Sequence, residues 1–346
     1  MPAAGSFLQS SDADADVHFI RLPKLQYLLL SYLILQAAFV APNMAISAIS
    51  GVSTPSISDK EKPPAPLSKE DLFAADFNPK HLNLIVQEGI VLGGGAAAIL
   101  LQIAEAGVGQ GVNEHSNFAH RVLDRLRTTM TFVYCMSYGT PEEKRTITDM
   151  ITRVHMSVSG TIDEGRDKGK TYSALDPELQ LWVAATLYAT GVKMYEQVYG
   201  EIDDDHLREK IYMEYSIIAS SLQVPPEMWP PSRRAFWEYW DHKIATIDVT
   251  QHAKEVAADV LYLTKAPFHL RMLMPAVRVV TAELLPERMR REFGVTAHPH
   301  RYKLLQFVVK AMYRPLPLRI RSLPARIYMK DMRKRLNQHR KIFEKA

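Results

Sequence analysis

The spacing of hydrophobic positions predicts a chain made almost entirely of helices. Between residues 140 and 160 the apolar side chains recur at the helical period and form one stripe, namely Ile147, Met150, Ile151, Val154 and Val158. Thr140 and Glu143 can form a capping box, and Pro141 suits the first helical position. Gly160 is expected to end this helix.

The same period predicts further helices along the chain. Their expected ranges are 118–138, 141–159, 177–199, 204–219, 232–247, 250–263 and 270–283. The helix 177–199 has the clearest limits, because Asp176 can cap it, Pro177 can open it and Gly200 can end it. Neither an alternating strand pattern nor an internal repeat is evident. We therefore expect an all-α fold with a single large helical domain over residues 76–346.

The first quarter of the chain has a different character. Residues 1–24 are small and polar and are expected to be a disordered leader, and the proline-rich stretch 59–75 is expected to be a linker. Between them, residues 25–58 carry no charge, and the part from Tyr27 to Ile49 is long enough to cross a bilayer. Because Pro42 and Asn43 interrupt it, this apolar segment is either a membrane anchor or an arm that packs on the domain.

The charge distribution limits the kinds of partner that the chain can bind, and the cysteine content limits its disulfides. The formal net charge is +4, but residues 310–346 hold 12 Lys and Arg against 2 Asp and Glu, a surplus of +10 that leaves −6 for the remainder. This basic tail favours an anionic membrane surface or is a solvated terminal helix. No nucleic-acid partner is expected, because no binding module is recognisable. Cys135 is the only cysteine, which excludes an intrachain disulfide.

His155 is the first candidate for chemistry. It lies on the apolar stripe of the helix 141–159, so its imidazole is expected to point into the interior. A neutral histidine in an apolar site is a suitable ligand for a haem iron or another transition metal. The alternative is a core histidine whose ring is hydrogen-bonded to a backbone carbonyl.

A second candidate lies at Glu114 and His115. They follow a glycine-rich stretch, 107–113, which is expected to be a turn. Glu114 could act as a base, and His115 could bind a haem propionate or a metal; a cap at the start of the next helix explains the same residues without chemistry. No phosphate-binding loop, hydrolase triad or zinc-protease signature is evident, which is compatible with a cofactor that carries the chemistry.

Several motifs in a fixed order resemble one known family. They are the glycine-rich start of the segment 93–102, Glu114-His115-Ser116, Arg125 to Thr129, Tyr138-Gly139, Val154-His155 with Gly160, the segment 172–182 and the segment 285–294. The series is similar to the rubber oxygenase catalytic domain, a family that includes latex clearing protein and the ER-bound fungal oxygenases of the mycophenolic acid pathway. The resemblance covers roughly residues 85–335.

The resemblance implies an all-helical domain that holds haem b, with His155 as the axial ligand of its iron. It also implies that Arg125 and Thr129 lie near the haem face where dioxygen binds. Arg127 has the same four-residue spacing to Thr131, so this register stays open. The sequence departs from the family pattern at two positions. The helix has no lysine between Arg127 and Tyr138, which concerns the distal side of the haem, and Ala184 stands where many relatives have histidine, which concerns the substrate.

The family relation implies a haem-dependent oxygenase acting on a hydrophobic small molecule with dioxygen. The expected substrate is a terpenoid or polyketide of secondary metabolism, and the expected reaction is C=C cleavage or another oxygenation. Such a substrate partitions into membranes, so we expect membrane association, with the endoplasmic reticulum as one candidate and the cytoplasm as the alternative. The competing hypothesis is a non-catalytic helical protein docked on a membrane, which would need no cofactor and would tolerate changes at His155.

Overall fold

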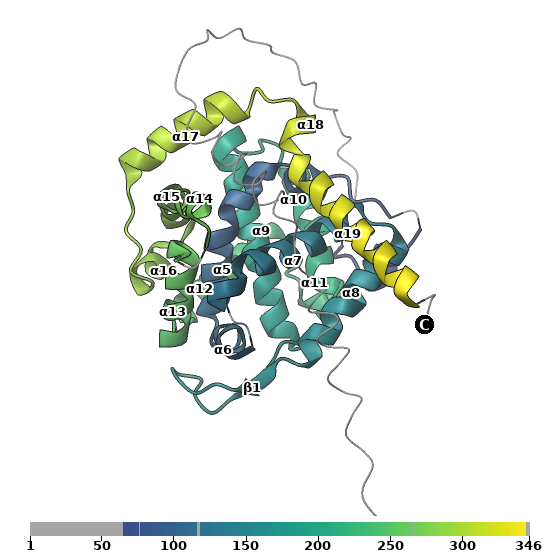
Figure 1. The fold of residues 1–346 in the computed structure, drawn as a ribbon, viewed down its shortest axis with the longest axis horizontal. Helices are drawn as coiled ribbons and strands as arrows, with labels where there is room; N and C mark the ends of the chain where they lie inside the picture. Colours follow the sequence, from purple (N-terminus) through teal and green to yellow (C-terminus); the bar gives the residue numbers. More distant parts are fainter. Residues whose placement is uncertain (1–64, 76, 116–117, 265, 344–346) are drawn as a thin grey trace, which may run out of the picture.

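A computed structural model describes residues 65–75, 77–115, 118–264 and 266–343 (Figure 1). The predicted leader 1–24, the apolar segment 25–58 and the first part of the linker lie outside these residues. Within the predicted linker 59–75, Lys69–Phe73 forms the helix α3, and its Leu72 is fully buried. This short helix begins with a complete capping box between Ser68 and Asp71.

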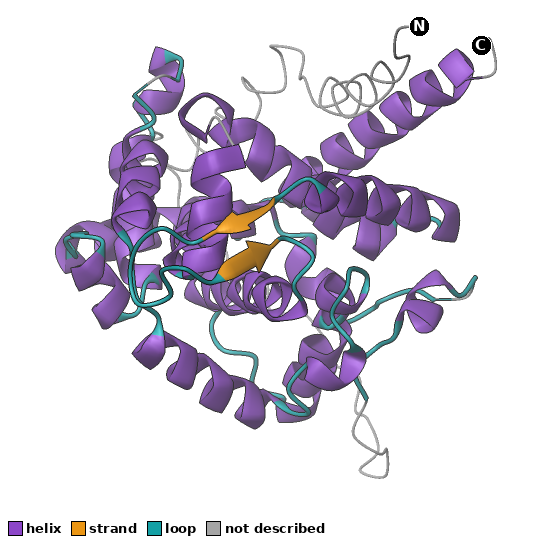
Figure 2. Ribbon diagram, turned by 90° about the horizontal axis from the view of Figure 1, so that it is seen from below, coloured by secondary structure: helices purple, strands orange, loops and turns teal. Residues whose placement is uncertain are grey.

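The described residues form helices around a shared core, which confirms the all-α prediction (Figure 2). The N-terminal half contains α3, α4 (Leu82–Val86), η1 (Gly89–Gly94), α5 (Gly95–Ala104), α6 (Ala106–His115), α7 (Phe118–Tyr138), α8 (Pro141–Met156) and α9 (Pro177–Tyr199). The C-terminal half contains α10 (Asp205–Tyr215), α11 (Ile217–Ser220), η2 (Pro226–Met228), α12 (Arg233–Thr246), α13 (Gln251–Tyr262), α14 (Phe268–Arg271), α15 (Met274–Leu284), α16 (Glu287–Glu292), α17 (Pro299–Tyr313), α18 (Leu318–Arg321) and α19 (Leu323–Phe343).

The helix α9 runs through the middle of the fold and is buried along most of its length. It packs against η1, α5 and α17, while α19 lies along α7. Small residues allow the close contacts: a Cβ on Gly94 would lie 3.4 Å from the backbone oxygen of Thr190 in α9. The indole of Trp182 on α9 donates a hydrogen bond to the backbone oxygen of Leu101 on α5, 2.9 Å away.

The one sheet in the described part of the chain is a two-stranded hairpin between α8 and α9, which the sequence pattern did not predict. It pairs β1 (Ser159–Thr161) with β2 (Thr171–Ser173) in antiparallel register, with Gly160 opposite Tyr172. Three-residue strands are too short to give an alternating pattern. The helix predicted to reach Ser159 therefore ends at Met156, and Gly160 belongs to the strand instead of ending the helix.

Residues 107–113 are also not the turn that was predicted. They lie in α6, where glycine serves close packing: a Cβ on Gly107 would lie 2.9 Å from Leu179, and one on Gly111 would lie 3.1 Å from the Tyr172 ring. Glu114 and His115 consequently lie at the C-terminal end of a helix. This places both side chains beside the hairpin.

Candidate functional site

The last turn of α8 carries His155 to one end of the molecule. Thr140 and Glu143 cap this helix as predicted, and it starts at Pro141, three residues after the last residue of α7. The His155 side chain is half-buried, and its Nδ1 is buried with no hydrogen-bond partner in the part of the chain that the structure describes. Burial, and then the positive charge of Arg125, lower the pKa of His155 to about 4. The imidazole is therefore neutral at physiological pH and keeps a nitrogen without a partner, as a metal-binding histidine requires.

Two candidate arginines on α7 have different surroundings. Arg125 acts on His155 electrostatically across the α7–α8 contact, and Thr129 lies half-buried one turn further along the same helix. Arg127 is fully buried and forms an ion pair with Asp331 of α19, which Arg335 also contacts at 2.6 Å. Arg127 is thus engaged by α19, whereas the Arg125 side chain is exposed and its charge acts on His155.

Glu114 lies at the end of α6 and is held by two donors. Its carboxylate accepts hydrogen bonds from the Tyr172 hydroxyl at 2.5 Å and from Gln110 Nε2 at 2.7 Å. These two bonds, that of Tyr172 foremost, lower the pKa of Glu114, so the group is ionised at neutral pH. Burial, followed by the Glu114 carboxylate, raises the pKa of Tyr172, which remains a protonated donor.

His115 completes this group on the hairpin side. Its Nε2 lies 3.3 Å from the backbone oxygen of Ser159, consistent with a donated hydrogen bond, and its ring makes an edge contact with Tyr172. Gly160 permits this packing, because a Cβ there would lie 2.9 Å from the Tyr172 hydroxyl and 3.1 Å from Glu114 Oε2. Tyr172 was not among the predicted site residues. Its place in a family motif was the only signal in the sequence, because 58 residues separate it from Glu114.

The predicted residues thus form two pairs at neighbouring positions. Glu114 and His115 lie at the end of α6 against the hairpin, and His155 on α8 is influenced by the charge of Arg125 on α7. The chain passes directly from His155 to the hairpin. The N–H of Val158, the residue before β1, donates a hydrogen bond to the backbone oxygen of His155. No group of three metal-binding side chains occurs in the described residues, so a protein-only metal centre is not indicated there. An axial haem ligand needs one histidine.

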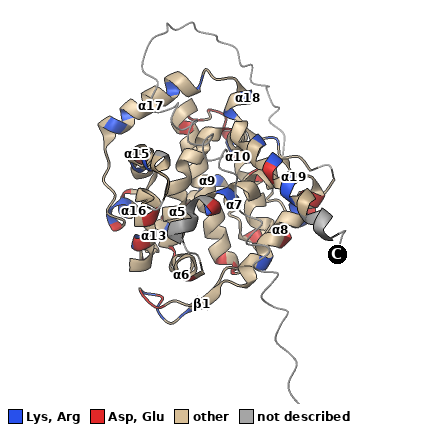
Figure 3. Ribbon diagram, viewed as in Figure 1, with Lys and Arg blue, Asp and Glu red and all other residues tan. Residues whose placement is uncertain are grey.

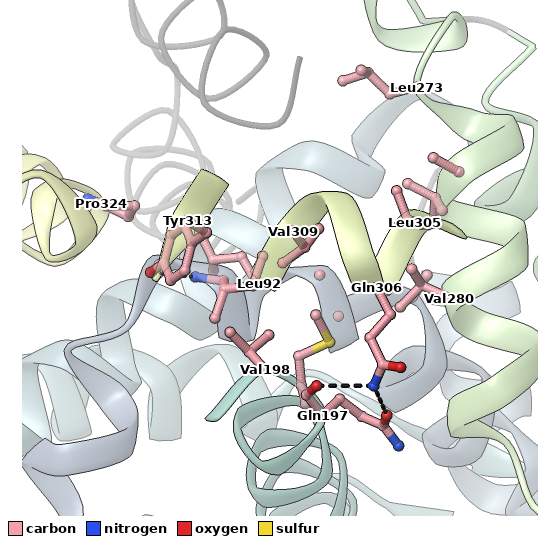
Figure 4. Close-up of a pocket in the computed structure, with 18 of the residues that line it drawn as sticks. Leu92, Gln197, Val198, Leu273, Val280, Leu305, Gln306, Val309, Tyr313 and Pro324 are labelled. Carbon is pink, nitrogen blue, oxygen red and sulfur yellow. Dashed lines mark hydrogen bonds between the residues drawn. The ribbon is translucent and has the colours of Figure 1, made fainter. Parts of the chain in front are cut away.

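A cavity of about 290 Å³ lies on the other side of the fold, under α17 (Figure 4). Its walls are largely aliphatic. They include residues of η1, α5, α9, α15 and α17, and Leu126 of α7. Leu305 and Val309 of α17 line it, and Gln306 of the same helix donates hydrogen bonds to the backbone oxygen and Oε1 of Gln197 on α9. Such a lining suits an apolar ligand.

Among the helices that the structure describes, no single one is long and apolar enough for a membrane span. A bent pair, Gly89–Ala104 with Ala106–His115, passes the same test at an angle of 105°. The segment 25–58 lies outside these residues.

Comparison with known proteins identifies the family of this chain. The family model described as "ER-bound oxygenase mpaB/B'/Rubber oxygenase, catalytic domain" matches residues 82–314. Two uncharacterized proteins, one of Mycobacterium bovis and one of Mycobacterium tuberculosis, are each 31% identical over 256 residues, which is 71% of this chain and 98% of theirs. No solved structure matches. The chain therefore belongs to the mpaB/B' and rubber oxygenase catalytic-domain family.

Proposed function

We propose that this oxygenase-family protein depends on haem b and acts on a hydrophobic small molecule with dioxygen. The observation that carries the proposal is the environment of His155, a neutral imidazole with a buried nitrogen that has no partner among the residues the structure describes. A polar atom left in this state costs free energy in the folded protein, which a bound iron would recover. His155 would hold the iron, and the haem would supply the redox chemistry by which dioxygen is activated.

The neighbouring residues suit the polar parts of such a site. Arg125 provides a positive charge close to His155 that could pair with a haem propionate or donate a hydrogen bond to a ligand. Thr129 adds a hydroxyl on the same side of α7, since residues four apart share a helical face. His115 is a further candidate for a propionate, whereas Arg127 would first have to leave its ion pair with Asp331.

Glu114 is the candidate base among the predicted residues. Its carboxylate is ionised at neutral pH, and the Tyr172 hydroxyl and Gln110 amide hold it in place. We assign it the role of a base that accepts a proton at Oε2 during the oxygenation. Tyr172 would act as a positioning residue that keeps Glu114 ionised and oriented.

The substrate class follows from the cavity and from the family. An aliphatic cavity of about 290 Å³ suits a terpenoid or polyketide chain, and C=C cleavage or another oxygenation in secondary metabolism is the proposed reaction. Such substrates dissolve in bilayers. We therefore also propose membrane association, with the endoplasmic reticulum as the candidate membrane because the family includes ER-bound members.

The first experiment compares absorption spectra of the purified protein with those of His155→Ala, His155→Gly and His242→Ala, with haem supplied during expression. His242 is an exposed histidine on α12 and serves as the matched control. We expect a strong Soret band in the wild type and His242→Ala, its loss or shift in His155→Ala, and its recovery in His155→Gly when imidazole is added.

Either of two results would contradict the proposal. An unchanged Soret band in His155→Ala would mean that another residue holds the haem. A folded, helical wild-type protein without any Soret band would favour the non-catalytic alternative. Circular dichroism of each variant separates loss of haem from loss of fold.

A further inference from the structure

The helix α17 has two apolar sides. Leu305 and Val309 face the cavity, while Leu304 and Phe307 are 65% and 70% exposed on the other side. Only Val309 of its 15 residues is fully buried. A helix that packs on a soluble core normally turns a polar face to water. The exposed side of α17 is therefore suited to an apolar environment.

Two short helices that line the same cavity also carry exposed apolar side chains. Phe268 at the start of α14 is 74% exposed, and Leu318 and Ile320 of α18 are 43% and 41% exposed. We call the exposed sides of α14, α17 and α18 the α17 face. Several large exposed apolar side chains on the helices around one cavity indicate an interaction site rather than ordinary surface.

The α17 face is also basic. The sequence has no acidic residue from 293 to 330, whereas the same helices and the connection between α17 and α18 carry exposed cations, namely Arg271, Arg301, Lys303, Arg314 and Arg319. Figure 3 shows Lys and Arg, and no Asp or Glu, along α17. Exposed apolar side chains and cations on the same helices suit a surface that is apolar inside and anionic outside, which is the chemistry of a membrane with acidic lipids.

The cavity connects with this face. Ile320 lines the cavity and is also 41% exposed, and each of α14, α17 and α18 contributes lining residues as well as exposed apolar ones. On the inner side, the lining residue of α7 is Leu126, the neighbour of Arg125. A lipophilic chain that entered beside α18 would thus be kept from water as it moved toward α7.

We propose that the α17 face docks on an anionic membrane and that the cavity beneath it takes a lipophilic chain directly from the bilayer. The docking is argued from the exposed residues alone. What happens to the lipophilic chain inside the cavity rests on the proposed oxygenase function. Leu304 and Phe307 insert among the lipids, and the exposed cations bind acidic headgroups.

The test is flotation of the full chain with vesicles of phosphatidylcholine and phosphatidylserine, against vesicles of phosphatidylcholine alone. We expect binding to the acidic vesicles that weakens with salt. The double variant Leu304→Gln, Phe307→Gln should lower the partition coefficient by about tenfold or more, because two exposed apolar side chains are lost. Its folding is checked by circular dichroism; since both residues are mostly exposed, the fold should be retained.

A charge-matched pair of variants tests the basic part. Arg301→Glu with Lys303→Glu reverses two cations of the α17 face, and Lys168→Glu with Lys254→Glu reverses two exposed cations on the hairpin and α13. The first pair should abolish the preference for acidic vesicles, and the second should retain it. Unchanged binding of the glutamine double variant, or equal effects of the two charge reversals, would overturn the docking and place the anchor elsewhere, for example in residues 25–58.

The cavity is tested with the fluorescent fatty acid cis-parinaric acid carried in the same vesicles. Ala276 lines the cavity, so Ala276→Trp should fill it and reduce transfer of the probe to the protein, while flotation stays as in the wild type. Transfer that is not reduced would overturn the cavity as acceptor. Soret absorbance is recorded in parallel: a wild-type protein without haem but with vesicle binding would refute the oxygenase proposal and leave the docking intact.

Discussion

Gly160 lies where three segments distant in sequence converge. Its Cα faces the Tyr172 ring from β2 and the Glu114 carboxylate from α6, at distances that leave no room for a Cβ. A methyl group there would have to displace the Tyr172 hydroxyl, the main group that lowers the pKa of Glu114. A glycine at this position therefore protects a hydrogen bond between two other residues.

Gly160→Ala should lower the free energy of unfolding by about 1–3 kcal/mol, the usual cost of adding a methyl group to a packed site. Tyr172→Phe removes the nearest atom, so the two changes should be less than additive, with a coupling of about 1 kcal/mol in a double-mutant cycle by urea unfolding. Strictly additive effects would show that Gly160 and the hydroxyl do not share this space.

At this scale the sequence predicted what depends on local pattern. The apolar stripe of α8 predicted that His155 points inward; its side chain is half-buried with Nδ1 buried, whereas Val154, on the same predicted stripe, is 41% exposed. The bond between Glu114 and Tyr172 could not be predicted, because it depends on a hairpin that brings together residues 58 positions apart. The ion pair of Arg127 with Asp331 likewise depends on the position of α19, which no local pattern records.

At the scale of elements, local signals fixed helix starts better than ends. The helix α9 has the predicted limits because Asp176, Pro177 and Gly200 each act within one turn of its ends. The helix α8 begins as predicted and stops three residues early, because the chain leaves it to pair with β2, a long-range contact. The capping box of α8 is joined to the C-terminal helix, since Arg333 donates to Glu143 at 2.8 and 3.2 Å.

The hydrogen bonds between Arg333 and Glu143 make the stability of the start of α8 depend on pH. Burial alone would raise the pKa of Glu143, but hydrogen bonds from Arg333 and from the Thr140 N–H outweigh it and hold the pKa below 4.5. In acid the unfolded chain then binds more protons than the folded protein, so the free energy of unfolding rises with pH in this window. Glu143→Gln should cost about 0.5–1 kcal/mol at pH 7 and less as the pH falls below about 4.5.

Urea unfolding of the haem-free protein at pH 7, 5.5, 4 and 3 would measure this difference. Arg333→Gln should give a similar profile, because it removes the strongest of the contacts that lower the pKa of Glu143. A loss that is the same at every pH would mean that the Glu143 side chain stabilises α8 through packing and not through its charge.

At the scale of the whole molecule, the two candidate regions are built from different elements. Glu114 and His155 lie on the helices next to the hairpin, and α17 lies away from the hairpin in Figure 1, while the cavity beneath α17 reaches α7 at Leu126. The sequence predicted α7 and α8, which carry Arg125 and His155, but the predicted helices did not include α17 or α18 of the cavity end. It could not show the cavity, because its walls come from six or more elements whose packing is set by contacts that no local pattern records.

A buried polar network holds the cavity end together. Glu88, which is 3% exposed and precedes η1, accepts hydrogen bonds from Tyr199 at 2.8 Å, Tyr313 at 3.0 Å and Arg321 at 2.5 Å. These donors belong to α9, α17 and α18, so one carboxylate joins the central helix to the two helices that cover the cavity. Arg321 also donates to the Leu316 oxygen in the connection between them.

Glu88→Gln should therefore loosen the cover of the cavity before it disturbs the rest of the fold. Neutralising one partner of a buried ion pair costs about 3–5 kcal/mol, and here the unpaired charge would be that of Arg321. Hydrogen–deuterium exchange should rise in residues 299–321 and stay near wild-type levels in α7 and α8, which lie outside the network. Tyr199→Phe, which removes one neutral donor, should have a smaller effect in the same segment. Uniformly faster exchange along the chain would contradict this assignment, because it would mean that Glu88 supports the core as a whole and that α17 and α18 do not open independently.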